Sequence, residues 1–155
     1  MTETATVHAS AVLVGARAVL IRGPAGAGKS RLALALLQAA EAGLLRFARL
    51  VGDDRVHLEA QHGRLLVRPA AALAGLIEIR GLGIRSLEHA PIAVVGLVVD
   101  VGAVDAERLP SATETETEVS GIRLPRLAVA AGTDPLPSVI AALPGTGGSE
   151  IKPRS

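Results

Sequence analysis

One glycine-rich segment constrains the fold of this chain more than any other feature. Its eight residues are Gly23, Pro24, Ala25, Gly26, Ala27, Gly28, Lys29 and Ser30. They match the pattern G-x-x-x-x-G-K-[ST], in which glycines let backbone N–H groups turn inward onto phosphates. An apolar run (residues 18–21) precedes the segment, and an alanine- and leucine-rich stretch follows it as far as Gly43. Strand, glycine loop and helix are the context that this motif requires, so we expect a nucleotide phosphate cradle at a helix N-terminus.

The last two residues of the segment carry specific chemistry. Lys29 is expected to reach the β- and γ-phosphates of the nucleotide. Ser30 is expected to place its hydroxyl oxygen on Mg²⁺, a hard cation that keeps several waters and takes one or two protein oxygens. The other reading, a chance glycine-rich turn, does not explain the flanking strand and helix.

Short apolar runs elsewhere predict an α/β fold. Strands are expected over residues 9–14, 18–21, 50–51, 56–59, 65–67, 76–80, 92–99 and 124–130, and helices over residues 29–42 and 135–143. The run at 92–99 is apolar almost throughout, as in a strand buried on both faces, and is expected near the centre of the sheet. We expect one domain over residues 1–144 and a flexible tail over 145–155, because 155 residues are too few for two full cores.

The composition excludes several classes of partner and site. Sixteen basic and fifteen acidic residues leave a net charge of +1, and Phe47 is the only aromatic residue, so nucleic acid is not an expected partner. There is no cysteine, which excludes disulfides and thiolate metal sites. No apolar run approaches the roughly 20 residues of a membrane-spanning helix, and residues 1–6 lack a basic signal-peptide start. We expect a cytoplasmic protein without membrane contact.

Acidic residues and one histidine are candidates for the remaining chemistry. Asp53 and Asp54 follow a short apolar stretch, where a carboxylate is expected beside the nucleotide, and neighbouring side chains of an extended chain point opposite ways, so one of the two should face the phosphates. A surface loop or helix cap remains the alternative. Glu78 alternates with two isoleucines ahead of a Gly-Leu-Gly turn, which suits either a Mg²⁺ ligand or an exposed edge strand. For His8, an ordinary polar role and a catalytic one both remain open.

Read together, four segments resemble the HPr kinase/phosphorylase family. They are His8-Ala9-Ser10, the glycine-rich segment, the string from Leu50 to Val56, and Glu78-Ile79-Arg80-Gly81-Leu82-Gly83-Ile84. The resemblance covers about residues 7–108 and is to the catalytic C-terminal domain, in a short form without the family's N-terminal domain. It implies a P-loop domain akin to the phosphoenolpyruvate carboxykinase-like fold, with a central mixed sheet and flanking helices.

The resemblance also implies an activity. The family is an ATP-dependent serine kinase that phosphorylates an HPr-like phosphocarrier protein of the phosphotransferase system, and it also runs the reverse dephosphorylation. ATP and Mg²⁺ are therefore the expected cofactors, and the family's hexamers leave a homo-oligomer open. A noncatalytic ATP-binding sensor and a P-loop nucleotide hydrolase are the alternatives.

Roles for individual residues follow from the same resemblance. His8 matches the family's active-site histidine, Asp54 its proton-handling carboxylate, and Asp53 the other half of its Asp-Asp pair. Glu78 matches its magnesium-binding glutamate. Arg108, in the string Asp-Ala-Glu-Arg-Leu, matches its catalytic arginine.

Overall fold

The computed structural model describes residues 5–106 and 115–143. The strands are β1 (Thr6–Val7), β2 (Ser10–Val14), β3 (Arg17–Arg22), β4 (Ala48–Gly52), β5 (Val56–Gln61), β6 (Arg64–Pro69), β7 (Leu76–Ile79), β8 (Gly83–Ser86), β9 (Ala93–Val101), β10 (Glu116–Val119) and β11 (Ile122–Val129). The helices are α1 (Lys29–Glu41) and α2 (Leu136–Ala142), with a 3₁₀ turn at Ala71–Leu73. Each strand and helix expected from the sequence is present, with ends displaced by a few residues.

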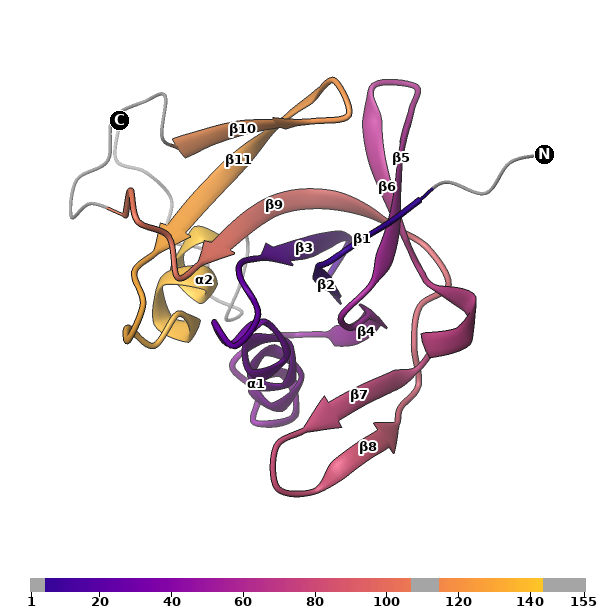
Figure 1. Cartoon of the computed structure of the whole chain (residues 1–155), viewed down its shortest axis with the longest axis vertical. Helices are drawn as coiled ribbons and strands as arrows, with labels where there is room; N and C mark the ends of the chain where they lie inside the picture. Colours follow the sequence, from indigo (N-terminus) through magenta and orange to yellow (C-terminus); the bar gives the residue numbers. More distant parts are fainter. Residues whose placement is uncertain (1–4, 107–114, 144–155) are drawn as a thin grey trace.

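The strands of the described residues form one large mixed sheet and one small hairpin. The path through the large sheet is β1-β5-β6-β9-β3-β2-β4, and β11, which carries β10 on its other edge, pairs with β9. β3 and β11 both run parallel to β9, and the remaining neighbours are antiparallel. β7 and β8 pair only with each other. The predicted mixed sheet is therefore confirmed, and Figure 1 shows the strongly curved course of β9 within it.

β9 holds the centre of this sheet, as its continuous apolar sequence predicts. Its residues 95–100 pair with β3 along one edge. The opposite edge pairs first with β6, at residues 93–94, and then with β11, at residues 98–101. A strand shared by three neighbours is buried on both faces, which explains why β9 lacks the polar and apolar alternation of a surface strand.

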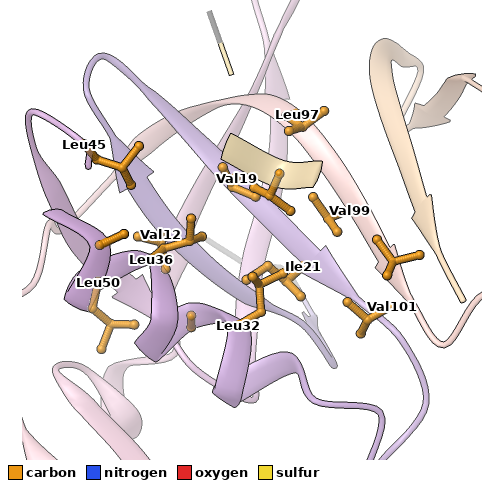
Figure 2. Packing of buried hydrophobic residues seen from close by; sticks show 14 of the residues in the cluster. Val12, Val19, Ile21, Leu32, Leu36, Leu45, Leu50, Leu97, Val99 and Val101 are labelled. Carbon is orange, nitrogen blue, oxygen red and sulfur yellow. The ribbon is translucent and has the colours of Figure 1, made fainter. Parts of the chain in front are cut away.

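Successive side chains of the central strands enter two different cores. Ile21 of β3 packs with Leu32 and Leu36 of α1, as Figure 2 shows. The preceding residue, Leu20, points to the other face and packs with Val67 of β6. This split follows from the two-residue period of a strand. No helix in the described part of the chain is long and apolar enough to cross a bilayer.

Both helices lie on the same face of the sheet. Val139 of α2 belongs to the cluster that contains Leu32 and Leu36 of α1. The other face is covered by the curl of β5 and β6, so the two helices do not flank the sheet from opposite sides. α1 ends where the sequence predicts, since Gly43 adopts a left-handed conformation (φ +84°) and Leu44 N–H donates to Ala39 O at 2.8 Å.

Candidate functional site

The glycine-rich segment connects β3 to α1 and rests on the carboxyl end of β9. A Cβ atom on Gly23 would lie 2.6 Å from the Val101 carbonyl oxygen, closer than non-bonded atoms approach. Gly28, the residue before the helix, has φ +103°, a conformation that L side chains rarely adopt. Both glycines are therefore required by the backbone path, which turns the N-terminus of α1 toward the space above the loop.

Lys29 lies against the loop that precedes it. Its ammonium nitrogen donates to the carbonyl oxygens of Gly23, at 2.8 Å, and Pro24, at 3.2 Å. The positive charge is thus held at the loop together with the N-terminus of α1, whose dipole also attracts anions. The segment thus combines a lysine charge with a helix N-terminus, as expected of a phosphate-binding loop.

Asp53 lies beside Ser30 and is almost fully buried. The Ser30 hydroxyl donates to Asp53, with Oγ 2.8 Å from Oδ1 and 2.9 Å from Oδ2. A second hydroxyl, Ser10 Oγ, donates to Oδ1 at 2.7 Å. Asp53 is only 4% exposed, and in the described part of the chain no lysine or arginine forms an ion pair with it. The structure therefore buries a carboxylate that is held by neutral donors alone.

Asp54 turns away from this pair toward a different set of partners. Its backbone is left-handed (φ +70°), and its carboxylate Oδ1 lies 3.9 Å from His8 Nδ1. Arg55 Nη2 contacts His8 Nε2 at 2.9 Å. A guanidinium can only donate, so Nε2 accepts and the proton of the neutral imidazole is on Nδ1, facing Asp54. The side chains of His8 and Asp54 are each more than 60% exposed, which leaves them accessible to a substrate.

The order of the strands explains why these residues meet. β2 lies between β3 and β4 and is antiparallel to both. The carboxyl ends of β3 and β4 and the amino end of β2 therefore share one edge of the sheet. This edge carries the glycine-rich segment, Asp53 with Asp54, and Ser10 with His8. Residues 8, 30 and 53 are far apart in sequence but adjacent in this topology.

The residues beside Ser30 fit a magnesium ion bound with a nucleotide. Ser30 and Asp53 offer hydroxyl and carboxylate oxygens, the ligand type that Mg²⁺ prefers, and the buried negative charge of Asp53 has no counter-ion among the described residues. No group of three or more histidine or acidic side chains able to hold a metal occurs in residues 5–106 and 115–143. Such a set is not required, because Mg²⁺ keeps waters and binds phosphate oxygens.

Glu78 and Arg108 are not brought into this arrangement by the described structure. Glu78 lies exposed on β7, opposite Ile84 of β8, and among the described residues it has no hydrogen bond or ion pair with Ser30 or Asp53. Its neighbour Ile77 is buried in the core against α1, so β7 itself is fixed beside the helix. Arg108 lies outside the described residues.

Sequence reasoning missed a four-residue charge network at the same edge of the sheet. Arg22, the last residue of β3, donates to both carboxylate oxygens of Asp100 on β9, at 2.7 and 2.8 Å. Arg126 of β11 donates to Asp100 as well and makes a two-fold contact with Asp105, at 2.8 and 3.0 Å. The network joins the three parallel strands β3, β9 and β11 next to the glycine-rich segment.

The network has two positive and two negative side chains, and their contacts shift the pKa values of Asp100, Asp105 and Arg126. Burial raises the pKa of Asp100, but hydrogen bonds from Arg22 and Arg126 outweigh it and hold that pKa below its usual range. The hydrogen bond from Arg126 likewise lowers the pKa of Asp105, and the pKa of Arg126 is raised in turn. One signal was present in the sequence: Asp100 is a charged residue within the apolar run that ends at Val101.

Comparison with known proteins shows similarity to one family over most of the chain. A family model described as the HPr serine kinase C-terminal domain matches residues 1–91. The HPr kinase/phosphorylase of Streptococcus thermophilus is 32% identical over 154 residues, covering 90% of this chain and 47% of that protein. The HPr kinase/phosphorylase of Geobacillus thermodenitrificans is 34% identical over 140 residues, covering 83% of this chain and 43% of that protein. The chain thus spans less than half the length of these curated relatives.

A solved structure shares the fold. The Hpr(Ser) kinase/phosphatase from Coxiella burnetii superimposes with a TM-score of 0.70 and 24% sequence identity, over 89% of this chain and 87% of that one. The curled mixed sheet with few helices is therefore common to both proteins.

Proposed function

The chain belongs to the HPr serine kinase C-terminal domain family, and we propose that it transfers the γ-phosphoryl group of ATP to a serine of an HPr-like phosphocarrier protein. The names of the relatives support a protein kinase rather than a sensor or a hydrolase. We include in the proposal a P-loop domain akin to the phosphoenolpyruvate carboxykinase-like fold, a cytoplasmic location, and a bound Mg²⁺.

The observation that carries the proposal is the divergence of the Asp53-Asp54 pair. Asp53 accepts a hydrogen bond from the Ser30 hydroxyl beside the glycine-rich segment, whereas Asp54 is exposed and faces His8. One carboxylate is thus available for the metal and nucleotide side of the reaction, and the other for the acceptor side. Phosphoryl transfer needs both, because it depends on neutralising phosphate charge and on orienting the attacking hydroxyl.

In this proposal each residue of the site has a separate role in the reaction. Lys29 and the backbone N–H groups of the loop hold the phosphates in the cradle. Ser30 and Asp53 would hold Mg²⁺, which would supply charge neutralisation of the phosphoryl oxygens. Asp54 accepts the proton of the acceptor serine as the oxygen–phosphorus bond forms and the bond to ADP breaks. His8, whose Nδ1 lies 3.9 Å from Asp54 Oδ1 and so beyond hydrogen-bond distance, lies with Asp54 on the acceptor side of the site.

Other parts of the proposal rest on the resemblance alone. Glu78 is proposed as a further Mg²⁺ ligand and Arg108 as a cation that offsets transition-state charge. In the reverse direction, inorganic phosphate attacks phosphoserine, and Asp54 returns the proton to the serine oxygen. A homo-oligomer belongs to the proposal too, since the family's chains associate.

The test is phosphate transfer to a protein acceptor. The purified chain is incubated with γ-labelled ATP, Mg²⁺ and the HPr-like proteins of its own organism, beside Lys29→Ala as the control. Label on a carrier serine with the unaltered chain, absent with Lys29→Ala, is the expected result. Release of free phosphate alone would favour a nucleotide hydrolase. Nucleotide binding without loss of label from ATP would favour a sensor.

A further inference from the structure

Ser10 is the side chain that connects the two aspartates. Its hydroxyl donates to Asp53 Oδ1 at 2.7 Å, and its oxygen accepts the backbone N–H of Asp54 at 3.3 Å. Ser10 lies at the amino end of β2, and its exposed fraction is 0%. Among the described residues, Ser10 and Asp53 are the only polar residues classed as buried. A fully buried hydroxyl whose proton and lone pair are both used is fixed in one orientation.

We propose that Ser10 is a positioning residue for metal-dependent nucleotide binding: through its hydroxyl it holds the Asp53 carboxylate in the orientation that meets Ser30. The inference rests on the proposed function for the role of the cradle. It concerns a residue to which the resemblance assigns no role.

The orientation of Asp53 depends on Ser10 for a geometric reason. Ser30 donates to both carboxylate oxygens at nearly equal distances, 2.8 and 2.9 Å, so this contact does not distinguish Oδ1 from Oδ2. Ser10 contacts Oδ1 alone. It therefore fixes the rotation of the carboxylate about its own axis. Hydrogen bonds to an ionised acceptor are about twice as strong as neutral ones, and Ser10, which donates this one, is fully buried.

The same hydroxyl supports the turn that separates the two aspartates. Asp54 has a left-handed backbone, which is unusual for a residue other than glycine. Three hydrogen bonds stabilise this turn: Asp54 N–H to Ser10 Oγ, Ala9 N–H to the Asp54 carbonyl oxygen at 3.2 Å, and Arg55 N–H to the Asp53 carbonyl oxygen at 2.8 Å. Loss of the Ser10 hydroxyl removes the first of these. Loss of the hydroxyl therefore acts mainly on the orientation of Asp53, on the metal side of the site. It acts in addition on the turn at Asp54, on the acceptor side.

The first measurement is the affinity for ADP, by isothermal titration calorimetry, with Mg²⁺ and with Mg²⁺ chelated. Removing the hydrogen-bond partner of a group in a metal site commonly costs about 10- to 100-fold in metal affinity or activity. For Ser10→Ala we expect roughly a 10-fold loss of ADP affinity with Mg²⁺ and an unchanged affinity without it. A loss of the same size under both conditions would overturn the inference, as would no loss under either.

Two further variants separate positioning from stability. Val67→Ala removes volume from a valine that is 0% exposed on β6, and it leaves every contact of Ser10 and Asp53 in place. It is expected to lower the unfolding temperature without changing the Mg²⁺ dependence of ADP binding. In an Asp53→Asn background, Ser10→Ala should bring no further loss of that dependence, because both changes act on one carboxylate. Independent losses that multiply would overturn the inference.

The outcome is separable from that of the proposed function. ADP binding requires no phosphate acceptor, so a chain that transfers no label to an HPr-like protein still tests the role of Ser10. If the unaltered chain bound ADP equally well with and without Mg²⁺, the inference about Ser10 would fail while transfer could still be measured.

Discussion

Replacing Asp100 with asparagine removes the carboxylate that lies between Arg22 and Arg126. The Asp100 side chain is 15% exposed and that of Arg126 is 13% exposed. The Asp100–Arg126 pair is therefore largely buried, and in the Asp100–Arg22 pair the carboxylate is the buried partner. Removing one partner of a buried ion pair typically costs about 3 to 5 kcal/mol, because a buried charge is left without compensation. Arg22 is 34% exposed and Arg126 retains Asp105, so we expect the lower end, about 3 kcal/mol at pH 7.

Urea unfolding at pH 7 measures this loss directly, and thermal unfolding gives a second reading. For a chain of this size each kcal/mol shifts the unfolding temperature by roughly 2 to 4 °C, so Asp100→Asn should lower it by about 6 to 12 °C. Glu116→Gln is the matched control, since Glu116 is 52% exposed and meets an exposed Arg123 at 3.5 Å. That change should cost no more than about 1 kcal/mol.

The pH dependence gives the sharper test. The folded pKa of Asp100 lies below its ordinary value, so the unfolded state binds more protons in the interval between the two values. The contribution of Asp100 to stability is therefore complete above the ordinary aspartate pKa of about 3.9 and is lost as the pH falls through the lower, folded value. The stability difference between the native chain and Asp100→Asn should shrink toward pH 3. An undiminished difference there, or one below about 1 kcal/mol at pH 7, would refute the reasoning.

Three further predictions concern the site. Gly23→Ala brings a Cβ within 2.6 Å of the Val101 carbonyl oxygen, so nucleotide affinity by calorimetry should fall sharply, and unchanged affinity would show that the loop is free to move. Asp54→Asn should reduce label transfer by about 10²- to 10⁴-fold with ATP binding retained; normal transfer would assign the base elsewhere. Glu78→Gln should raise the Mg²⁺ concentration needed for half-maximal transfer, and an unaltered requirement would remove Glu78 from the metal site.

The sequence predicted the elements of the fold well because each has a strong local signal. The cradle is a spaced motif with fixed neighbours, and the helix after it ends at a glycine that adopts the expected left-handed conformation. The continuous apolar run of β9 indicated its central place. The curl of the sheet and the placement of both helices on one face depend on long-range packing, which has no local signal.

The contacts among the candidate site residues could not be predicted from the sequence. Asp53 and Asp54 do point to different partners, but the cause is a left-handed turn at Asp54 and not the extended chain that the sequence analysis assumed. The hydrogen bonds of Ser10 depend on β2 lying between β3 and β4, and this order cannot be read from a run of six residues. The Arg22–Asp100–Arg126 contacts likewise require three parallel strands, β3, β9 and β11, to lie side by side.

β9 also sets the order in which a growing chain can complete its phosphate cradle. The residues matched by the family model end at 91, and they include all of the glycine-rich segment but none of β9. A fragment ending there would leave one edge of β3 and one edge of β6 without their partner strand. Unpaired edges of this kind invite association between chains. The glycine-rich segment is thus synthesised early. The end of β9, against which Gly23 packs, follows only after about 100 residues.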